Sequence, residues 1–529
     1  MKRCPECRRD YYDDTLLYCL DDGNALLEGP ASMDEPATAI LSEPPKVAGG
    51  LMRSSNSRDE PRTAIFRSVE SQTDNSNSVA VLSFVNMSAE AENEYFCDGL
   101  AEELLNALAK IDHLKVAART SAFSFKGMNT NVREIGEKLG VKTVLEGSVR
   151  KSGNRLRISV QLVNATDGYH LWSERYDREM HDIFDVQDEI TLAVVDALKI
   201  KLLGTEKAEV IKRHTENTEA YKTYLKGRYL RHTKNDHGGA LRAFEDAVRL
   251  DPAHAPSWVG VAEGSVLAAH YSIIPAREAC EKAKAALATA KEIQGESADA
   301  LYVEGFIAFL ERDWLASDKA YRRAIELQPT HIHALGSFGL IQCVRGKLDE
   351  ALIFFKRARE SDPLAAFPYA ITGAGLLTAG RTKDSLSFFE QAFTFEKENT
   401  LALWGSCIAN IALGNFTKGI AAAERGVVAS RRTDFFLGLL GWAFSVAGRP
   451  KDARAILAEL RNHSAAQPSV VSESWLLGAL GDKEAAFELL TRAEHEHQAF
   501  VCYLRLPCFE GIRDDLRFTD LRRRLGLAE

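Results

Sequence analysis

Long apolar runs are missing from this chain of 529 residues. No stretch approaches the roughly 18 to 20 uninterrupted apolar residues that a helix needs to span a bilayer. The first five residues include two basic side chains, Lys2 and Arg3, but no apolar run follows them. This predicts that the chain has no secretory signal. We therefore expect a cytoplasmic protein without a membrane span.

Cysteine is scarce and unevenly placed. Only nine cysteines occur, and three of them lie within the first 19 residues. The other six are spread over patterns that are mostly helical, at Cys97, Cys280, Cys343, Cys407, Cys502 and Cys508. This distribution is typical of one metal site plus reduced core thiols, and it argues against a disulfide framework.

The sequence also lacks the common catalytic signatures. It contains no G-x4-G-K-[ST] phosphate loop, no H-E-x-x-H helix, no kinase motif set and no G-x-S-x-G elbow. The net charge of −9 gives no general attraction to nucleic acid or anionic membrane. We predict no enzymatic activity and no catalytic residues. The alternative, an unrecognised enzyme in the middle of the chain, finds no acid, base and nucleophile grouped together.

Residues 1–28 contain a candidate metal site. Cys4 and Cys7 form a C-x2-C pair, and Cys19 stands before a turn at Gly23. Thiolates on tight turns suit tetrahedral zinc. The unit resembles a zinc ribbon, except that Asp22 stands where the fourth cysteine would be. We predict structural zinc held by four ligands, with Asp21 as the alternative to the last of them: Cys4, Cys7, Cys19 and Asp22. The other interpretation is a degenerate ribbon held by its apolar residues alone.

A linker and a mixed domain follow. Residues 29–76 are rich in Ser, Pro, Glu, Asp and Asn, which predicts a disordered tether. From residue 77 to 204 the pattern indicates strands and helices in the order β-α-β-α-β-β-β-α. The strands expected at 143–149 and 156–163 flank a hairpin turn at Gly153 and Asn154. We interpret Asp98 as a helix N-cap and expect Trp172 to pack on the sheet. Arg119 to Ser121 could receive an anion, although a capped loop is the simpler interpretation.

Four stretches of this domain resemble a known family. They are residues 79–88 (VAVLSFVNMS), 95–100 (YFCDGL), 145–150 (LEGSVR) and 171–177 (LWSERYD). They resemble the TolB amino-terminal-like domain, which in many bacterial signalling proteins stands directly before tetratricopeptide repeats. The resemblance implies a bacterial regulatory or scaffolding protein and carries no catalytic residues with it.

The remainder of the chain repeats with a period of 34 residues. Gly305, Gly339 and Gly373 are 34 apart. The same period relates three further sets: Ala324, Ala358 and Ala392; Tyr321, Phe355 and Phe389; Pro329 and Pro363. Small residues let paired helices approach, the aromatic residue fills the gap between them, and proline ends the second helix. This pattern is that of the tetratricopeptide repeat family. We predict about eight repeats over residues 217–497 and a C-terminal capping tail over 498–529.

The family pattern also indicates which residues face the groove of such a stack. They are Tyr302, Phe306, Leu340, Leu377, Trp404, Ile408 and Trp442. Because these residues are largely apolar, a hydrophobic segment or partner helix fits better than a C-terminal carboxylate. The alternative is that several of them simply pack in the core of the superhelix.

Together these observations predict a multidomain protein. Its parts are a small zinc ribbon, a mixed-sheet α/β domain and an all-α tetratricopeptide solenoid. We expect a non-enzymatic scaffold or regulator that binds protein or peptide partners. The alternative is a nucleic-acid-linked regulator whose ribbon carries a small basic cluster of Lys2, Arg3, Arg8 and Arg9, although neighbouring aspartates largely cancel that charge.

Overall fold

The computed structural model describes seven stretches of the chain and the backbone of three short strands near the N-terminus. The stretches are residues 77–90, 93–111, 113–200, 215–234, 236–270, 273–462 and 469–527. The chain separates into two compact units, Met1–Asn75 and Ser76–Glu529. Within the described stretches, no helix combines the length and apolar character that crossing a membrane requires.

In the first unit, three short strands form a small antiparallel sheet. Strand β1 (Lys2–Arg3) pairs with β2 (Asp10–Tyr11) on one side and with β3 (Leu27–Glu28) on the other. The predicted zinc ligands Cys4, Cys7, Cys19 and Asp22 lie outside the described residues, as do Asp21 and the predicted linker. The zinc ribbon therefore stays a prediction.

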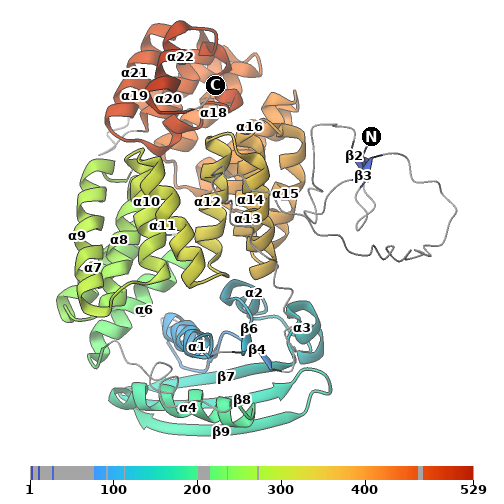
Figure 1. Cartoon of the computed structure of the whole chain (residues 1–529), viewed down its shortest axis with the longest axis vertical. Helices are drawn as coiled ribbons and strands as arrows, with labels where there is room; N and C mark the ends of the chain where they lie inside the picture. The colour runs from blue at the N-terminus through green and yellow to red at the C-terminus, as the bar shows by residue number, and fades with distance from the viewer. Residues whose placement is uncertain are drawn as a thin grey trace, which may run out of the picture. The chain divides into compact units, whose positions relative to one another are not determined.

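The second unit begins with a six-stranded mixed sheet, coloured blue to green in Figure 1. Its strand order is β6-β4-β7-β8-β9, with β5 also paired to β7. Strand β4 runs parallel to β6 and β7, whereas β7, β8 and β9 form antiparallel hairpins. The strands are β4 (Ser78–Val81), β5 (Val85–Asn86), β6 (Lys115–Val116), β7 (Thr143–Ser152), β8 (Arg155–Asn164) and β9 (His170–Glu179).

Alternation along β4 explains why helices cover both faces of this sheet. Val79 and Val81 belong to the same core as the apolar residues of α1 and α4, whereas Ala80 packs in a separate core with Ile135 of α3. The helices are α1 (Glu94–Leu108), α2 (Arg119–Phe123), α3 (Val132–Leu139) and α4 (Ile183–Ala197), with a single 3-10 turn η2 (Met180–Asp182) before α4.

The mixed-sheet prediction is confirmed, with one error at the start of α1. Asp98 is not an N-cap, because the cap position is Asn93 and Asp98 lies inside the helix. Its buried carboxylate accepts a hydrogen bond from Ser83 Oγ (2.5 Å) and contacts Lys126 Nζ (2.6 Å). The dipeptide Asp-Gly suggested a helix start because it is common at turns. Here Gly99 is needed for another reason: a Cβ there would lie 2.7 Å from Leu225 of α6.

From residue 218 onward the described chain is helical, and consecutive helices form eight antiparallel pairs that stack as in Figure 1. The first helices are α6 (Thr218–His232), α8 (Ala255–His270), α10 (Ala298–Leu310), α12 (Ile332–Val344), α14 (Ala366–Thr378), α16 (Thr400–Ala412), α18 (Asp434–Val446) and α20 (Val470–Leu480). The second helices are α7 (His237–Leu250), α9 (Ala276–Gln294), α11 (Trp314–Leu327), α13 (Leu348–Ser361), α15 (Thr382–Phe395), α17 (Phe416–Ala429), α19 (Pro450–Asn462) and α21 (Lys483–His495).

The glycines and aromatic residues of the 34-residue period meet inside each pair. A Cβ at Gly339 would lie 2.6 Å from the ring of Phe355, and a Cβ at Gly373 would lie 2.6 Å from the ring of Phe389. Phe389 also closes on Gly405 of the next pair, where a Cβ would approach its ring to 2.1 Å. Each ring is therefore held between two glycines, which fixes the spacing of successive pairs. The tetratricopeptide solenoid is confirmed on these contacts.

Candidate partner-binding surface

The seven residues predicted to line the groove all lie on first helices. Tyr302 and Phe306 are on α10, Leu340 on α12 and Leu377 on α14, and the remaining three are Trp404 and Ile408 on α16 and Trp442 on α18. Five of the seven are buried, at 5 % exposure or less: Tyr302, Leu377, Trp404, Ile408 and Trp442. Phe306 and Leu340 are partly buried and pack against the same core.

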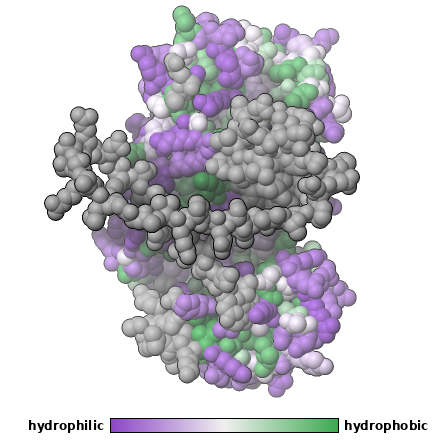
Figure 2. Space-filling model, turned by 45° about the vertical axis from the view of Figure 1, so that its right-hand side comes forward, coloured by the Kyte–Doolittle hydropathy of each residue, from purple (hydrophilic) through white to green (hydrophobic). Residues whose placement is uncertain are grey.

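The part of the described surface that Figure 2 draws is largely polar. Figure 2 shows mainly hydrophilic residues over both the C-terminal helices and the sheet domain, with hydrophobic residues in smaller groups between them. The apolar residues of the first helices are therefore turned inward rather than displayed. Another segment of the same chain covers part of these apolar residues.

Residues 499–527, here named the closing segment, pack on the first helices. The segment contains two 3-10 helices, η3 (Ala499–Cys502) and η4 (Pro507–Ile512), and one α-helix, α22 (Leu516–Arg524). It follows a turn at His497, whose φ of 56° reverses the chain after α21. Many of its apolar side chains are buried, including Leu506, Phe509 and Ile512.

Phe500 makes the most extensive inner contact of the closing segment. Its ring centroid lies 5.7 Å from that of Trp404, 4.4 Å from that of Phe435 and 6.3 Å from that of Trp475. These partners come from α16, α18 and α20. On another side the ring lies 5.0 Å from His270 of α8, whose pKa is lowered to about 4 by burial. One aromatic residue therefore joins early and late first helices.

Two networks of buried polar groups join the mixed-sheet domain to the solenoid, beside a hydrogen bond from Gln187 of α4 to the Tyr221 hydroxyl of α6. At the first, Glu102 of α1 pairs with Arg119 of α2 (Oε2 to Nε, 3.0 Å) and with Arg228 of α6. The Glu102 side chain is only 4 % exposed. Burial lowers the pKa of Arg228, but the neighbouring Glu102 outweighs it and the pKa is raised. These two ion pairs, which share Glu102, hold α1 against the first helix pair.

The second site joins α2 to the turn between α13 and α14. Asp362 is 1 % exposed and accepts hydrogen bonds from the backbone N–H (2.9 Å) and the Oγ of Ser121. Ser121 Oγ in turn accepts from the backbone N–H of Leu364 (2.9 Å). Burial raises the pKa of Asp362, although the Ser121 contacts oppose the shift. Residues 119–121 form the start of helix α2 rather than a loop, and the carboxyl group that reaches them, Asp362, belongs to the same chain.

The sheet domain also contains a cavity of about 740 Å³ beside the sheet. Its walls come from β5, β7, β8 and β9, from the loop between β4 and β5 and from the loop after α2, and they include Ser83, Lys126, Glu146, Ser159 and Gln161. Lys126 Nζ lies 2.5 Å from Glu94 and 2.6 Å from Asp98. Burial alone would lower the pKa of Lys126, but the two carboxylates raise it.

The cavity is lined by charged side chains, Lys126, Glu94 and Glu146, beside neutral polar ones. Lys126 stays protonated, so it cannot accept a proton at neutral pH. Among the described residues, neither histidine nor cysteine lines the cavity. The nearby thiol of Cys97 is buried, and burial raises its pKa to about 12. All six cysteines of the described stretches are buried and outside disulfides.

No group of three or more metal-ligating side chains occurs within the described stretches.

One protein-family model matches the sheet domain. It is described as the second domain of HilA/YgeH-like transcriptional regulators and matches residues 75–193. This is a different description from the TolB amino-terminal-like domain that the four sequence stretches resemble, so that resemblance stays a prediction. The match covers less than half of the chain and leaves the solenoid outside it.

A curated relative comes from Rhizobium meliloti (strain 1021). It is named putative adenylate cyclase 3 and is 42 % identical over 180 residues. The match covers 34 % of this chain and 31 % of the relative. The chain thus spans about a third of the length of the curated relative it matches.

Three solved structures are similar to parts of the chain. YrrB, described as a TPR protein with an unusual peptide-binding site, is 23 % identical, with 35 % of this chain and 90 % of that chain covered and a TM-score of 0.23. The type IV pilus biogenesis factor PilW is 14 % identical, with 47 % of this chain and 94 % of that chain covered and a TM-score of 0.28. MamA is 22 % identical, with 32 % of this chain and 94 % of that chain covered and a TM-score of 0.23. Because these scores are low, the repeat assignment rests on the period and the glycine contacts.

Sequence reasoning missed the closing segment. It also missed the buried polar groups of Glu102 and Asp362 that join the sheet domain to the solenoid, here named the polar joint. Glu102 and Arg228 are separated by 126 residues, and Ser121 and Asp362 by 241, so no local sequence spacing predicts either contact. The closing segment gave a partial signal. Phe500, Tyr503 and Phe509 are concentrated in a stretch for which the sequence predicts only a capping role.

Proposed function

We propose that this chain is a non-enzymatic scaffold or regulatory protein that binds a partner protein or peptide on the first helices of its solenoid. The observation that carries the proposal is the binding of a stretch of polypeptide to those helices within the chain itself. Phe500 packs among residues of three successive first helices, at Trp404, Phe435 and Trp475. A surface that accepts one such stretch has the chemistry to accept another.

Site-specific photo-crosslinking tests this proposal. A benzoylphenylalanine would replace Phe306 or Leu340 on the first helices of the full chain, within the cell that naturally makes it. Matched controls would carry the same group at Leu315 on α11 or Ile353 on α13, which are second-helix residues exposed by 81 % and 60 %. We expect a partner to be captured from the first-helix positions only. Capture only from the second-helix positions would overturn the proposal.

The second candidate is a transcriptional regulator linked to nucleic acid. The description of the matched family, a domain of transcriptional regulators, favours it. In this case the basic residues of the N-terminal unit, Lys2, Arg3, Arg8 and Arg9, would contact phosphates.

A mobility-shift titration of the full chain with duplex DNA, at several salt concentrations, tests this candidate. Phosphate contacts predict a shift that weakens steeply with salt and is lost in a Lys2→Glu/Arg3→Glu variant. A shift that is absent, or that is unchanged in this variant, removes the candidate.

We also propose that the N-terminal unit holds structural zinc through Cys4, Cys7, Cys19 and Asp22. The support is the C-x2-C spacing and the thiolate chemistry. A closed site of this kind would stabilise a unit too small to have much of a hydrophobic core. Elemental analysis of the full chain should give one zinc per chain, and the Cys19→Ser variant should lose it. Stoichiometric zinc in that variant would refute the ligand set.

A further inference from the structure

The inner contact of the closing segment leaves hydrogen-bond donors unused. The indole N–H groups of Trp404 and Trp475 are buried and have no hydrogen-bond partner among the described residues. Both indoles lie around Phe500, with ring centroids at 5.7 and 6.3 Å. A phenylalanine ring offers neither indole an ordinary acceptor. Buried donors are usually satisfied in native structures, so this site is incomplete in the presence of Phe500.

The closing segment extends along much of the solenoid. Tyr503 packs on Phe309 of α10, with ring centroids 6.3 Å apart. The indole N–H of Trp314 donates to the backbone carbonyl of Leu525 (3.0 Å). At the start of the turn, Arg312 Nη1 lies 2.8 Å from His497 Nδ1. Residues of the third helix pair are thereby joined to the chain beyond the eighth pair.

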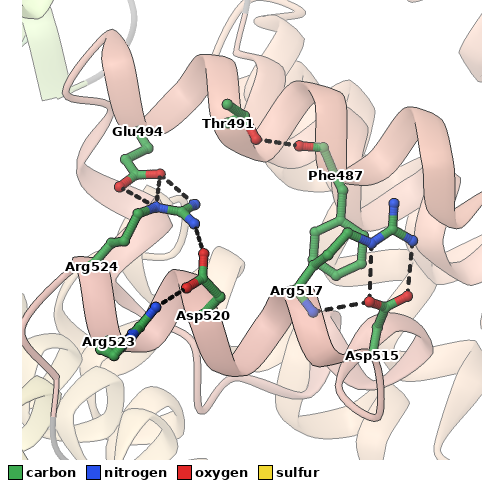
Figure 3. A network of polar contacts seen from close by, with 8 residues as sticks. All are labelled: Phe487, Thr491, Glu494, Asp515, Arg517, Asp520, Arg523 and Arg524. Carbon is green, nitrogen blue, oxygen red and sulfur yellow. Dashed lines mark hydrogen bonds and ion pairs between the residues drawn. The ribbon is translucent and has the colours of Figure 1, made fainter.

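Exposed ion pairs fasten the end of this segment. Arg524 of α22 contacts Glu494 of α21 (2.7 Å), and Arg517 contacts Glu484 (2.7 Å) while its guanidinium lies over the ring of Phe487 (4.3 Å). Figure 3 shows Arg524 with Glu494 and with Asp520 of α22, and Arg517 with Phe487 and with Asp515, the N-cap of α22. Both arginine side chains are 42 % exposed. Pairs this exposed are weak and are screened by salt.

We infer that the Phe500 site, formed by Trp404, Phe435 and Trp475, is the anchor site for the partner and that the closing segment holds it closed. The partner is a peptide segment that presents an aromatic side chain flanked by hydrogen-bond acceptors. The ring replaces that of Phe500, and the acceptors take the two indole N–H groups that Phe500 leaves unused. This inference rests on the proposed function and adds the partner's chemistry and its regulation.

The test uses the full chain and a labelled peptide. The peptide copies residues 498–505 with Cys502 replaced by serine, and its twin carries alanine in place of Phe500. The chain is compared with a latch variant, Arg517→Glu/Arg524→Glu. A matched control, Arg323→Glu/Arg425→Glu, reverses two similarly exposed arginines on α11 and α17 that pair with Glu296 and Glu398. Fluorescence anisotropy reports binding, and hydrogen exchange of residues 499–512 reports opening.

We expect the latch variant to bind the peptide at least tenfold more tightly than the wild-type chain and the control do. The peptide with alanine in place of Phe500 should bind none of the three chains. Exchange over residues 499–512 should accelerate in the latch variant but not in the wild-type chain or the control. A Phe500→Ala chain, which removes the ring from the site but keeps Arg517 and Arg524, should also bind the peptide more tightly than the wild-type chain does. Two peptides with aspartate on either side of the phenylalanine test for acceptors, and at least one should bind more tightly than the parent.

Two results would overturn the inference. Equal peptide affinity in all four chains would mean that the segment does not control the site. Accelerated exchange without peptide binding, in the latch and Phe500→Ala chains, would mean that the opened site does not take an aromatic anchor. Neither result touches the crosslinking outcome, so a partner still captured at Phe306 or Leu340 would leave the proposed function standing. Circular dichroism of each variant confirms that it is folded.

Discussion

The sheet domain and the closing segment are both attached to the solenoid from outside the helix pairs, but by different chemistry. Beside apolar packing of α1 and α4 on α6, as at Gly99 on Leu225 and Phe184 on Tyr221, the sheet domain uses buried polar groups, with Glu102 between two arginines and Asp362 on Ser121. The closing segment uses an aromatic cluster around Phe500, with its ion pairs at the exposed α22.

This difference predicts different behaviour of the two contacts. A buried charge without its partner is strongly unfavourable, so the polar joint stays closed or the protein unfolds. An aromatic contact is less directional, and exposed ion pairs contribute little, so the closing segment can be exchanged for another segment of similar chemistry. We therefore regard the joint as a fixed support and the closing segment as the replaceable part.

The largest effect is expected from Glu102→Gln. It removes the negative charge between Arg119 and Arg228, and breaking a buried pair in this way typically costs about 3–5 kcal/mol of unfolding free energy. Urea unfolding of the full chain measures the loss. The control is Glu134→Gln, which removes an exposed pair with Lys138 and should cost less than about 1 kcal/mol. Equal losses in the two variants would contradict the role given to the joint.

Ser121→Ala should have the next largest effect. It removes one donor to the buried carboxylate of Asp362 and the acceptor for the backbone N–H of Leu364. Leaving buried polar groups short of partners costs about 1–3 kcal/mol. Thr289→Ala, at a partly exposed threonine whose hydroxyl bonds a carbonyl of its own helix, is the matched control. If Ser121→Ala changes stability no more than Thr289→Ala, the second polar site does not stabilise the joint.

The pH response should separate the closing segment from the joint. Burial holds the pKa of His270 at about 4, below its ordinary value of 6.5. The folded chain therefore binds fewer protons than the unfolded chain between these values. Stability is fully present above pH 6.5 and is lost as the pH falls. At pH 5.5 this one group costs about 1.4 kcal/mol.

The test compares stability at two pH values, about 7.5 and 5.5, in His270→Gln and in His181→Gln. His181 is exposed by 67 % and serves as control. The loss of stability on acidification should shrink in His270→Gln and stay unchanged in the control. An unchanged loss in both would mean that protonation near Phe500 does not contribute.

The sequence predicted the repeat and the sheet well because their signals are local. Gly339 and Phe355 lie 16 positions apart within one helix pair. Because the pair repeats, the same packing of a glycine against an aromatic ring recurs several times in the sequence. The hairpin at Gly153 and Asn154 is equally local: β7 ends at Ser152 and β8 begins at Arg155.

The candidate site could not be predicted to the same extent. The seven groove residues were chosen from the family pattern, which does not include the closing segment. Trp404 contacts Phe500, whereas Tyr302 lies instead beside His331 and His333 of the next first helix. Which apolar residues of a first helix face a segment therefore depends on where that segment runs. Since the segment makes contacts more than 200 residues back along the chain, at His270 for example, no periodicity encodes its path.

The smallest effect is expected from the exposed pairs of α22, and it sharpens the comparison most. Arg524→Ala and Arg517→Ala should each reduce stability by only about 0.2–1 kcal/mol, because both arginines are largely hydrated. Their effect on α22 itself should depend on salt: exchange of its amides in the wild-type chain should accelerate between about 0.02 M and 0.5 M NaCl, as the pairs are screened. In the double alanine variant that salt response should disappear. The amides of α1 at the buried joint should respond to salt in neither chain. If α1 and α22 respond alike, the two contacts do not differ in the way their chemistry implies.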